Sequence, residues 1–188
     1  IKYGYGNFGN LAHQYQEARK KYPVEVIDWF WSFLPSSGAK ILDLGCGTGI
    51  STRQLAERGG MVMGCDKDEL MIAEANKIPS LVIEKEKFFH GNSYVDELKA
   101  ARIDFIVLAG FLWKLPSALI KVYQKKIVNI HPALLPNYGG KGMYGLYVHE
   151  AVIAHKEKES GITIHYVDDL YDHGDIIFQA RCPVMDDD

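Results

Sequence analysis

The sequence has few cysteines, no long hydrophobic run and no strong excess of charge of either sign. Its three cysteines, Cys46, Cys65 and Cys182, are odd in number and lack metal-ligand spacing, which predicts reduced thiols in a cytoplasmic protein. No apolar run approaches the roughly 20 residues that a membrane span needs, and we expect no signal peptide at residues 1–4. With 24 acidic and 21 basic side chains the net charge is -3, which argues against a broad nucleic-acid surface. We therefore expect small-molecule partners only, without nucleic acid or membrane, and the sequence indicates no oligomeric state.

Short apolar runs alternate with segments of helical periodicity along the chain. Strands are predicted at 39–44, 61–65, 80–83, 104–109, 126–130, 161–167 and 175–183, and helices at 23–34, 50–58, 69–77, 93–101, after 115 and near 147–156. This alternation predicts an α/β fold with a parallel sheet and helices on both faces. No low-complexity linker interrupts it, so we expect one co-folded domain over residues 1–188.

A glycine-rich turn follows the first predicted strand, in the run Asp43-Leu44-Gly45-Cys46-Gly47-Thr48-Gly49. A strand that ends in Gly-x-Gly-x-Gly and passes into a helix lets a ligand approach bare backbone beside free N–H donors. Asp66 ends the next strand, where a carboxylate can accept both hydroxyls of a ribose. The pair fits a nucleoside ligand, and the alternative is a plain strand-to-helix turn.

The first part of the chain, residues 1–77, resembles class I S-adenosylmethionine-dependent methyltransferases. The resemblance rests on Leu11-Ala12-His13-Gln14-Tyr15, on the glycine-rich turn and on the run from Gly64 to Met71. It implies S-adenosylmethionine or S-adenosylhomocysteine as the ligand. The residues implied to bind it are Gly45, Gly47 and Gly49 at the methionine part and Asp66 at the ribose.

A second set of polar residues, Asn129, His131 and Asp172, suits acyl transfer to an amine. Formyl transfer passes through a tetrahedral oxyanion that needs hydrogen-bond donors. Asn129 and His131 are two residues apart, so an amide and an imidazole share one face of a strand and can supply those donors. Asp172 lies in a loop and can fix the imidazole tautomer and relay protons through water. The alternative is a core asparagine beside a satisfied histidine, and we interpret His165 as structural.

The second part, residues 78–188, resembles the phosphoribosylglycinamide formyltransferases of purine biosynthesis, which move a formyl group from a reduced folate onto an amine. The specific marks are Val107-Leu108-Ala109-Gly110-Phe111, the run from Asn129 to Pro136, and the run from Gly161 to Val167 that leads to Asp172. The resemblance implies formyl-tetrahydrofolate as cofactor. The implied site residues are Asn129, His131 and Asp172 for catalysis, and Trp113 and Leu115 at the folate pocket. In this interpretation the family's phosphate-binding loop is replaced by the glycine-rich turn, and its C-terminal helix is missing.

Both families build a three-layer α/β/α Rossmann-like sandwich with a mostly parallel sheet and the early strand order 3-2-1-4. The junction Lys77/Ile78 falls between a predicted helix and a predicted strand. We therefore interpret the chain as an engineered chimera of the two transferase fragments, with no or weak catalysis and residual S-adenosylmethionine or S-adenosylhomocysteine binding; a natural fusion is a weaker option. The first alternative is an active folate-dependent formyltransferase of purine biosynthesis, and the second is a methyltransferase.

Overall fold

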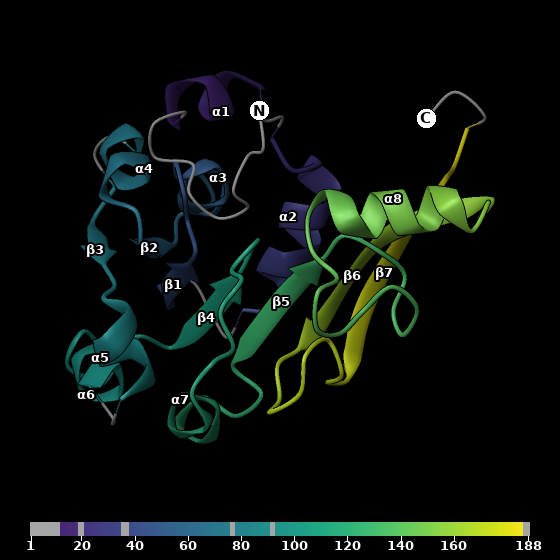
Figure 1. The fold of residues 1–188 in the computed structure, drawn as a ribbon. Helices are drawn as coiled ribbons and strands as arrows, with labels where there is room; N and C mark the ends of the chain where they lie inside the picture. Colours follow the sequence, from purple (N-terminus) through teal and green to yellow (C-terminus); the bar gives the residue numbers. More distant parts are fainter. Residues whose placement is uncertain (1–11, 19–20, 35–37, 76–77, 91–92, 186–188) are drawn as a thin grey trace. The chain divides into compact units, whose positions relative to one another are not determined.

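The computed structural model describes residues 12–18, 21–34, 38–75, 78–90 and 93–185 (Figure 1). The chain divides into two compact units, Ile1–Ile106 and Val107–Asp188, and each is described by itself. The prediction of one co-folded domain stays a prediction. Residues 1–4, Leu11 and Lys77, which the sequence interpretation used, lie outside the described residues.

The first unit alternates helices and short strands. Its elements are α1 (Ala12–Ala18), α2 (Val24–Ser32), β1 (Lys40–Leu44), α3 (Ile50–Ala56), β2 (Met61–Asp66), α4 (Glu69–Glu74), β3 (Ser80–Val82), α5 (Lys85–Phe89), α6 (Ser93–Ala100) and β4 (Phe105–Leu108), which runs across the unit boundary. The strand order β3-β2-β1-β4 confirms the predicted order 3-2-1-4, and β2 pairs in parallel with both β1 and β3. The helices α3 and α4 pack against β2.

The central strands of the first unit consist largely of buried apolar side chains. Ile41, Leu42 and Leu44 of β1 are at most 2% exposed and Ile106 of β4 is fully buried, as expected of strands in the middle of a parallel sheet. The helix α4 begins where the Asp68 side chain accepts hydrogen bonds from the backbone N–H groups of the next turn.

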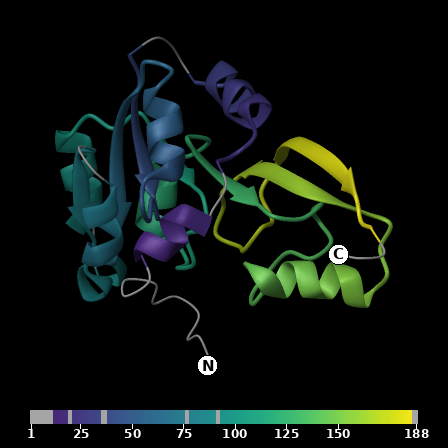
Figure 2. The ribbon, with the colours of Figure 1, turned by 90° about the horizontal axis from the view of Figure 1, so that it is seen from above.

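The second unit is built on antiparallel strands and two helices. Its elements are α7 (Ser117–Val122), β5 (Ile127–His131), α8 (Leu146–Ala154), β6 (Glu159–Tyr166) and β7 (Ile176–Pro183). β6 pairs antiparallel with both β5 and β7, and Figures 1 and 2 show α8 along one face of β6 and β7. Val148 and Val152 of α8 are buried with Ile164 of β6, so the apolar side of the helix closes this core.

Candidate active site

The site is built on two paired strands of the second unit. Alternation along β5 places Asn129 and His131 on the same face, as predicted, and the β5–β6 register sets His165 opposite Asn129 and Thr163 opposite His131. Neighbouring residues on one face of an antiparallel pair are close enough for their side chains to bond. The strand pair therefore brings four polar side chains to one face, whereas the alternation along β5 alone predicts only Asn129 and His131 there.

Asp172 reaches this cluster from the loop between β6 and β7. Its Oδ1 accepts a hydrogen bond from Asn129 Nδ2 at 3.3 Å, and its Oδ2 accepts one from the backbone N–H of Gly140 at 3.0 Å. The backbone at Asp172 has a φ of 51°, in the left-handed region where Asp and Asn are enriched. The loop returns tightly, because a Cβ at Gly174 would collide with the carbonyl oxygen of Tyr166. The structure therefore brings Asn129, His131 and Asp172 together, as the sequence predicts.

The imidazole of His131 has a defined orientation. Its Nε2 lies 2.7 Å from the carbonyl oxygen of Tyr138, and a carbonyl can only accept, so Nε2 carries the hydrogen. The other nitrogen, Nδ1, lies 3.6 Å from Asp172 Oδ1. In the neutral ring Nδ1 is therefore the free base, and it faces a carboxylate.

His165 belongs to the cluster as a buried residue whose two ring nitrogens are both hydrogen-bonded. Its Nδ1 donates to the Tyr166 carbonyl at 2.8 Å, so its Nε2 accepts from Asn129 Nδ2 at 3.1 Å. The same Nε2 lies 3.6 Å from Asp172 Oδ1. Both amide hydrogens of Asn129 are thus used within the cluster. The pairing of β6 with β5 reveals this role, and the sequence of β6 alone does not.

Burial and charge act in opposite directions on the two titrating groups. Burial lowers the pKa of His131 below its ordinary value, and the Asp172 charge and the Tyr138 carbonyl oppose this only in part. Burial alone would raise the pKa of Asp172, but the interactions with His165, His131 and the Gly140 N–H outweigh it and hold that pKa below its ordinary value. At neutral pH the pair is therefore a neutral imidazole beside an ionised carboxylate.

A buried polar network supports the segment that follows His131. Thr163, which is fully buried, donates to the Ala133 carbonyl at 2.6 Å and accepts from the Leu135 N–H at 3.0 Å. Gln179 of β7 donates to the Leu135 carbonyl and to Thr163 Oγ1, each at 2.9 Å. These bonds fix the backbone between His131 and Tyr138 to the sheet.

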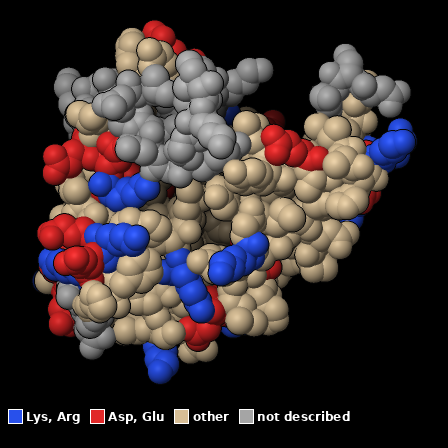
Figure 3. Space-filling model, viewed as in Figure 1, with Lys and Arg blue, Asp and Glu red and all other residues tan. Residues whose placement is uncertain are grey.

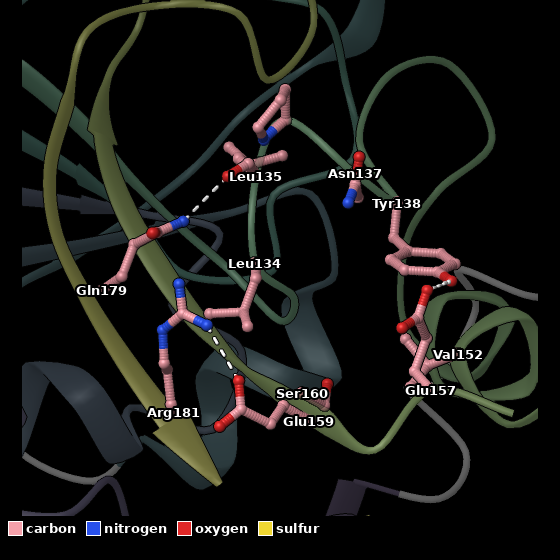
Figure 4. Close-up of a pocket in the computed structure, with 11 residues that line it drawn as sticks. Leu134, Leu135, Asn137, Tyr138, Val152, Glu157, Glu159, Ser160, Gln179 and Arg181 are labelled. Atoms are coloured by element: carbon pink, nitrogen blue, oxygen red, sulfur yellow. Dashed lines mark hydrogen bonds and ion pairs between the residues drawn. The ribbon is translucent and has the colours of Figure 1, made fainter.

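Trp113 and Leu115, predicted to line a folate pocket, lie in different environments. Leu115 is 5% exposed and is part of the core. Trp113 is half-buried and contacts Phe111 edge to face, with ring centroids 5.9 Å apart. Neither residue is among those that line the cavity of Figure 4.

The glycine-rich turn of the first unit is explained by its own backbone. Gly45, Gly47 and Gly49 all have positive φ, and a Cβ at Gly49 would lie 2.8 Å from Ile78 Cδ1. Asp66 Oδ2 accepts from the Gly47 N–H at 2.9 Å, and its Oδ1 accepts from the Asp68 N–H at 3.0 Å. The Asp66 carboxylate therefore stabilises the backbone of the glycine-rich turn.

The Formyl transferase family model matches residues 56–188, well over half of the chain. The chain belongs to this family. A phosphoribosylglycinamide formyltransferase, chloroplastic, from Vigna unguiculata is 44% identical over 120 residues, which are 62% of this chain and 38% of that protein. A phosphoribosylglycinamide formyltransferase from Bacillus subtilis is 33% identical over 131 residues, 66% of this chain and 65% of that protein. The chain thus spans well under half the length of the plant relative.

Solved structures show the same fold. The crystal structure of phosphoribosylglycinamide formyltransferase from Bacillus halodurans has a TM-score of 0.66 and 30% identity, and the match covers 79% of this chain and 82% of that one. The predicted fold class, an α/β Rossmann-like sandwich with a mostly parallel sheet, is confirmed.

These comparisons overturn the chimera interpretation. The family match begins at residue 56, upstream of the supposed junction at Lys77/Ile78, and it takes in Asp66. Nothing found supports a methyltransferase segment or S-adenosylmethionine as ligand. The interpretation of the chain as a chimera with no or weak catalysis is therefore wrong, and the relatives favour the alternative, a formyltransferase.

Proposed function

We propose that this protein transfers a formyl group from formyl-tetrahydrofolate to the amine of phosphoribosylglycinamide, with Asn129, His131 and Asp172 as its catalytic residues. One observation carries the proposal most. His131 is held with its free Nδ1 toward the Asp172 carboxylate, 3.6 Å from Oδ1, while Nε2 is occupied by a carbonyl. This arrangement suits a general base that must take up a proton and give it back.

The reaction needs one proton to move twice. The amine nitrogen attacks the formyl carbon, and the carbonyl oxygen takes the electron pair to give a tetrahedral oxyanion. His131 Nδ1 accepts the proton that the amine loses, and Asp172 stabilises the imidazolium that results. When the oxyanion collapses, the bond from the formyl carbon to the folate nitrogen breaks, and His131 returns the proton to that nitrogen. The products are a formamide and tetrahydrofolate.

The oxyanion takes its donor from Asn129. Asn129 Nδ2 donates two hydrogen bonds, and the one to Asp172 Oδ1, at 3.3 Å, is longer than the one to His165. Catalytic hydrogen bonds are often long in the free enzyme and rearrange when the substrate binds. We therefore assign this amide hydrogen to the oxyanion, with the bond to His165 keeping the amide in place.

The substrates proposed here are small molecules. On the face shown in Figure 3, basic and acidic side chains lie side by side over the described residues, in keeping with a net charge of -3. None of the helices in the described part of the chain has the length and hydropathy needed to cross a bilayer. We assign Trp113 and Leu115 to the wall of the folate site, with Trp113 as the residue that can contact the ligand because it is half-buried.

The test is a product assay with both substrates. The protein is incubated with formyl-tetrahydrofolate, with and without phosphoribosylglycinamide, and formylated product and free formate are measured by mass spectrometry. We expect formylated product only when both substrates are present, and little formate in either case. Formate release that does not depend on the amine would contradict the proposal, because it would assign the chain to hydrolysis.

A further inference from the structure

We propose that Tyr138, held by Glu157, is a positioning residue that fixes the tautomer of His131. The inference rests on the proposed function for its kinetic consequence, although the tautomer itself can be observed without substrate. Tyr138 contacts His131 through its backbone carbonyl, at 2.7 Å from Nε2, and its side chain points to other partners.

The tautomer of His131 is contested by two acceptors. The Tyr138 carbonyl favours a hydrogen on Nε2, whereas the Asp172 carboxylate, 3.6 Å from Nδ1, favours a hydrogen on Nδ1. Only the first tautomer leaves Nδ1 free to take up a proton. If the carbonyl moves away, the carboxylate draws the hydrogen to Nδ1 and the base is lost.

Tyr138 needs external support to keep its carbonyl in place. Its φ is 56°, in the left-handed region that a tyrosine adopts only under strain. Its neighbour Gly139 packs closely, since a Cβ there would lie 2.5 Å from Leu135 Cδ2 and 3.2 Å from Asp172 Cβ. The next residue, Gly140, donates to Asp172 Oδ2. Tyr138 is therefore the strained point of a segment tied down on both sides.

The side chain of Tyr138 supplies that support. Its hydroxyl donates to Glu157 Oε1 at 2.7 Å, and its ring lies against His155, with centroids 5.7 Å apart. The bond to Glu157 raises the pKa of the Tyr138 phenol, so the phenol keeps its proton and stays a donor. Glu157 is itself fixed after α8 by its N–H bond to the Val152 carbonyl.

The surroundings place this contact apart from the reacting groups. Tyr138 and Glu157 line a cavity of about 330 Å³, whose wall also includes Leu135 and Gln179. Figure 4 shows the Tyr138 hydroxyl joined to Glu157. The Tyr138 phenol bonds to Glu157 and not to His131, Asn129 or Asp172. Loss of its hydroxyl therefore acts on the reaction through the backbone carbonyl.

The experiment reads the His131 tautomer directly, by nitrogen-15 NMR of the imidazole in the full chain without substrate. The variants are Tyr138→Phe and Glu157→Ala, which break the bond, and Glu157→Gln, whose amide oxygen can still accept it. Glu150→Gln, an exposed change on α8, is the control for loss of charge. We expect the Nε2–H form in the wild type, a clear rise of the Nδ1–H form in the two breaking variants, and recovery in Glu157→Gln.

The kinetic arm uses the same proteins. We expect kcat for formyl transfer to fall about 10- to 100-fold in Tyr138→Phe and Glu157→Ala, with KM little changed, and to stay near the wild-type value in Glu157→Gln and Glu150→Gln. An unchanged tautomer in both breaking variants overturns the inference, whatever the rates. A tautomer shift in a protein without formyl transfer leaves the inference standing and removes the proposed function instead.

Discussion

Asn129 and His165 face each other across the β5–β6 ladder, with Asn129 Nδ2 3.1 Å from His165 Nε2. Because His165 Nδ1 must donate to the Tyr166 carbonyl, its Nε2 can only accept, and the amide of Asn129 is oriented with its donors toward the cluster. One backbone carbonyl thus fixes the direction of the amide through the ring between them.

This relationship predicts the effect of His165→Phe. The change removes the acceptor for a half-buried amide and the donor for the Tyr166 carbonyl, so we expect a loss of about 1–3 kcal/mol in the free energy of unfolding. Denaturant unfolding measures it. The matched control is His173→Phe. Because the His173 side chain is 65% exposed, the free energy of unfolding of this variant should change little. Equal losses in the two variants would show that His165 has no special place in the cluster.

Asp172→Asn keeps the size of the side chain and removes its charge. We expect kcat to fall by about 10²- to 10⁴-fold, because the imidazolium formed during transfer loses its stabilising charge. The Asp172 charge also raises the pKa of His131, so that pKa should fall further in the variant. An NMR titration of His131 checks this, and a His131 pKa that rises or does not move would be inconsistent with the geometry.

The rate should depend on pH through His131. The base must be neutral, and burial lowers its pKa below the ordinary value of about 6.5, so kcat/KM should persist to below pH 6.5 and fall as His131 becomes protonated. The free energy of unfolding depends on the same pKa. Because folding lowers the pKa of His131, the unfolded state binds more protons, and the stability that the neutral His131 contributes is lost as pH falls below about 6.5. The lowered pKa of Asp172 adds stability above about pH 3.9 that is lost at more acid pH. A pH–rate profile with half the activity gone well above pH 6.5 would argue against His131 as the base.

Gly174→Ala tests how the Asp172 loop is held. The new Cβ would meet the Tyr166 carbonyl, so the loop must shift and carry Asp172 away from His131. We expect kcat to fall about 10- to 100-fold, since displacements near 1 Å have such effects. His173→Ala, one residue earlier and exposed, is the control. If both variants keep wild-type rates, the close approach of the loop to β6 is not needed for the reaction.

The strands can be predicted closely from the sequence, and the site can be predicted in part. The apolar run before the glycines gave β1 to within a residue, and the spacing of Asn129 and His131 gave their common face. His165 was missed because its role depends on β6 pairing antiparallel with β5, a long-range contact that no local pattern encodes. Residues 85–89 were not predicted as a helix, since five residues are too few for a clear periodicity.

The glycine-rich turn shows why the functional interpretation failed. Positive φ at Gly45, Gly47 and Gly49, and the packing of Gly49 on Ile78, favour glycine whether or not a ligand is near. The sequence shows that glycine is present. It does not show whether backbone conformation, close packing or a ligand is the reason. Read as a ligand site, the turn suggested a second enzyme family that the comparisons do not support.

The most direct test of the account is single-turnover transfer of an isotope-labelled formyl group from formyl-tetrahydrofolate to phosphoribosylglycinamide, in the wild type, His131→Ala and His149→Ala. His149 is an exposed histidine on α8 and serves as the control for loss of an imidazole. We predict label on the amine in the wild type and in His149→Ala, and a rate lower by about 10²- to 10⁴-fold in His131→Ala. No transfer by the wild type, or the same rate in His131→Ala, would contradict the account.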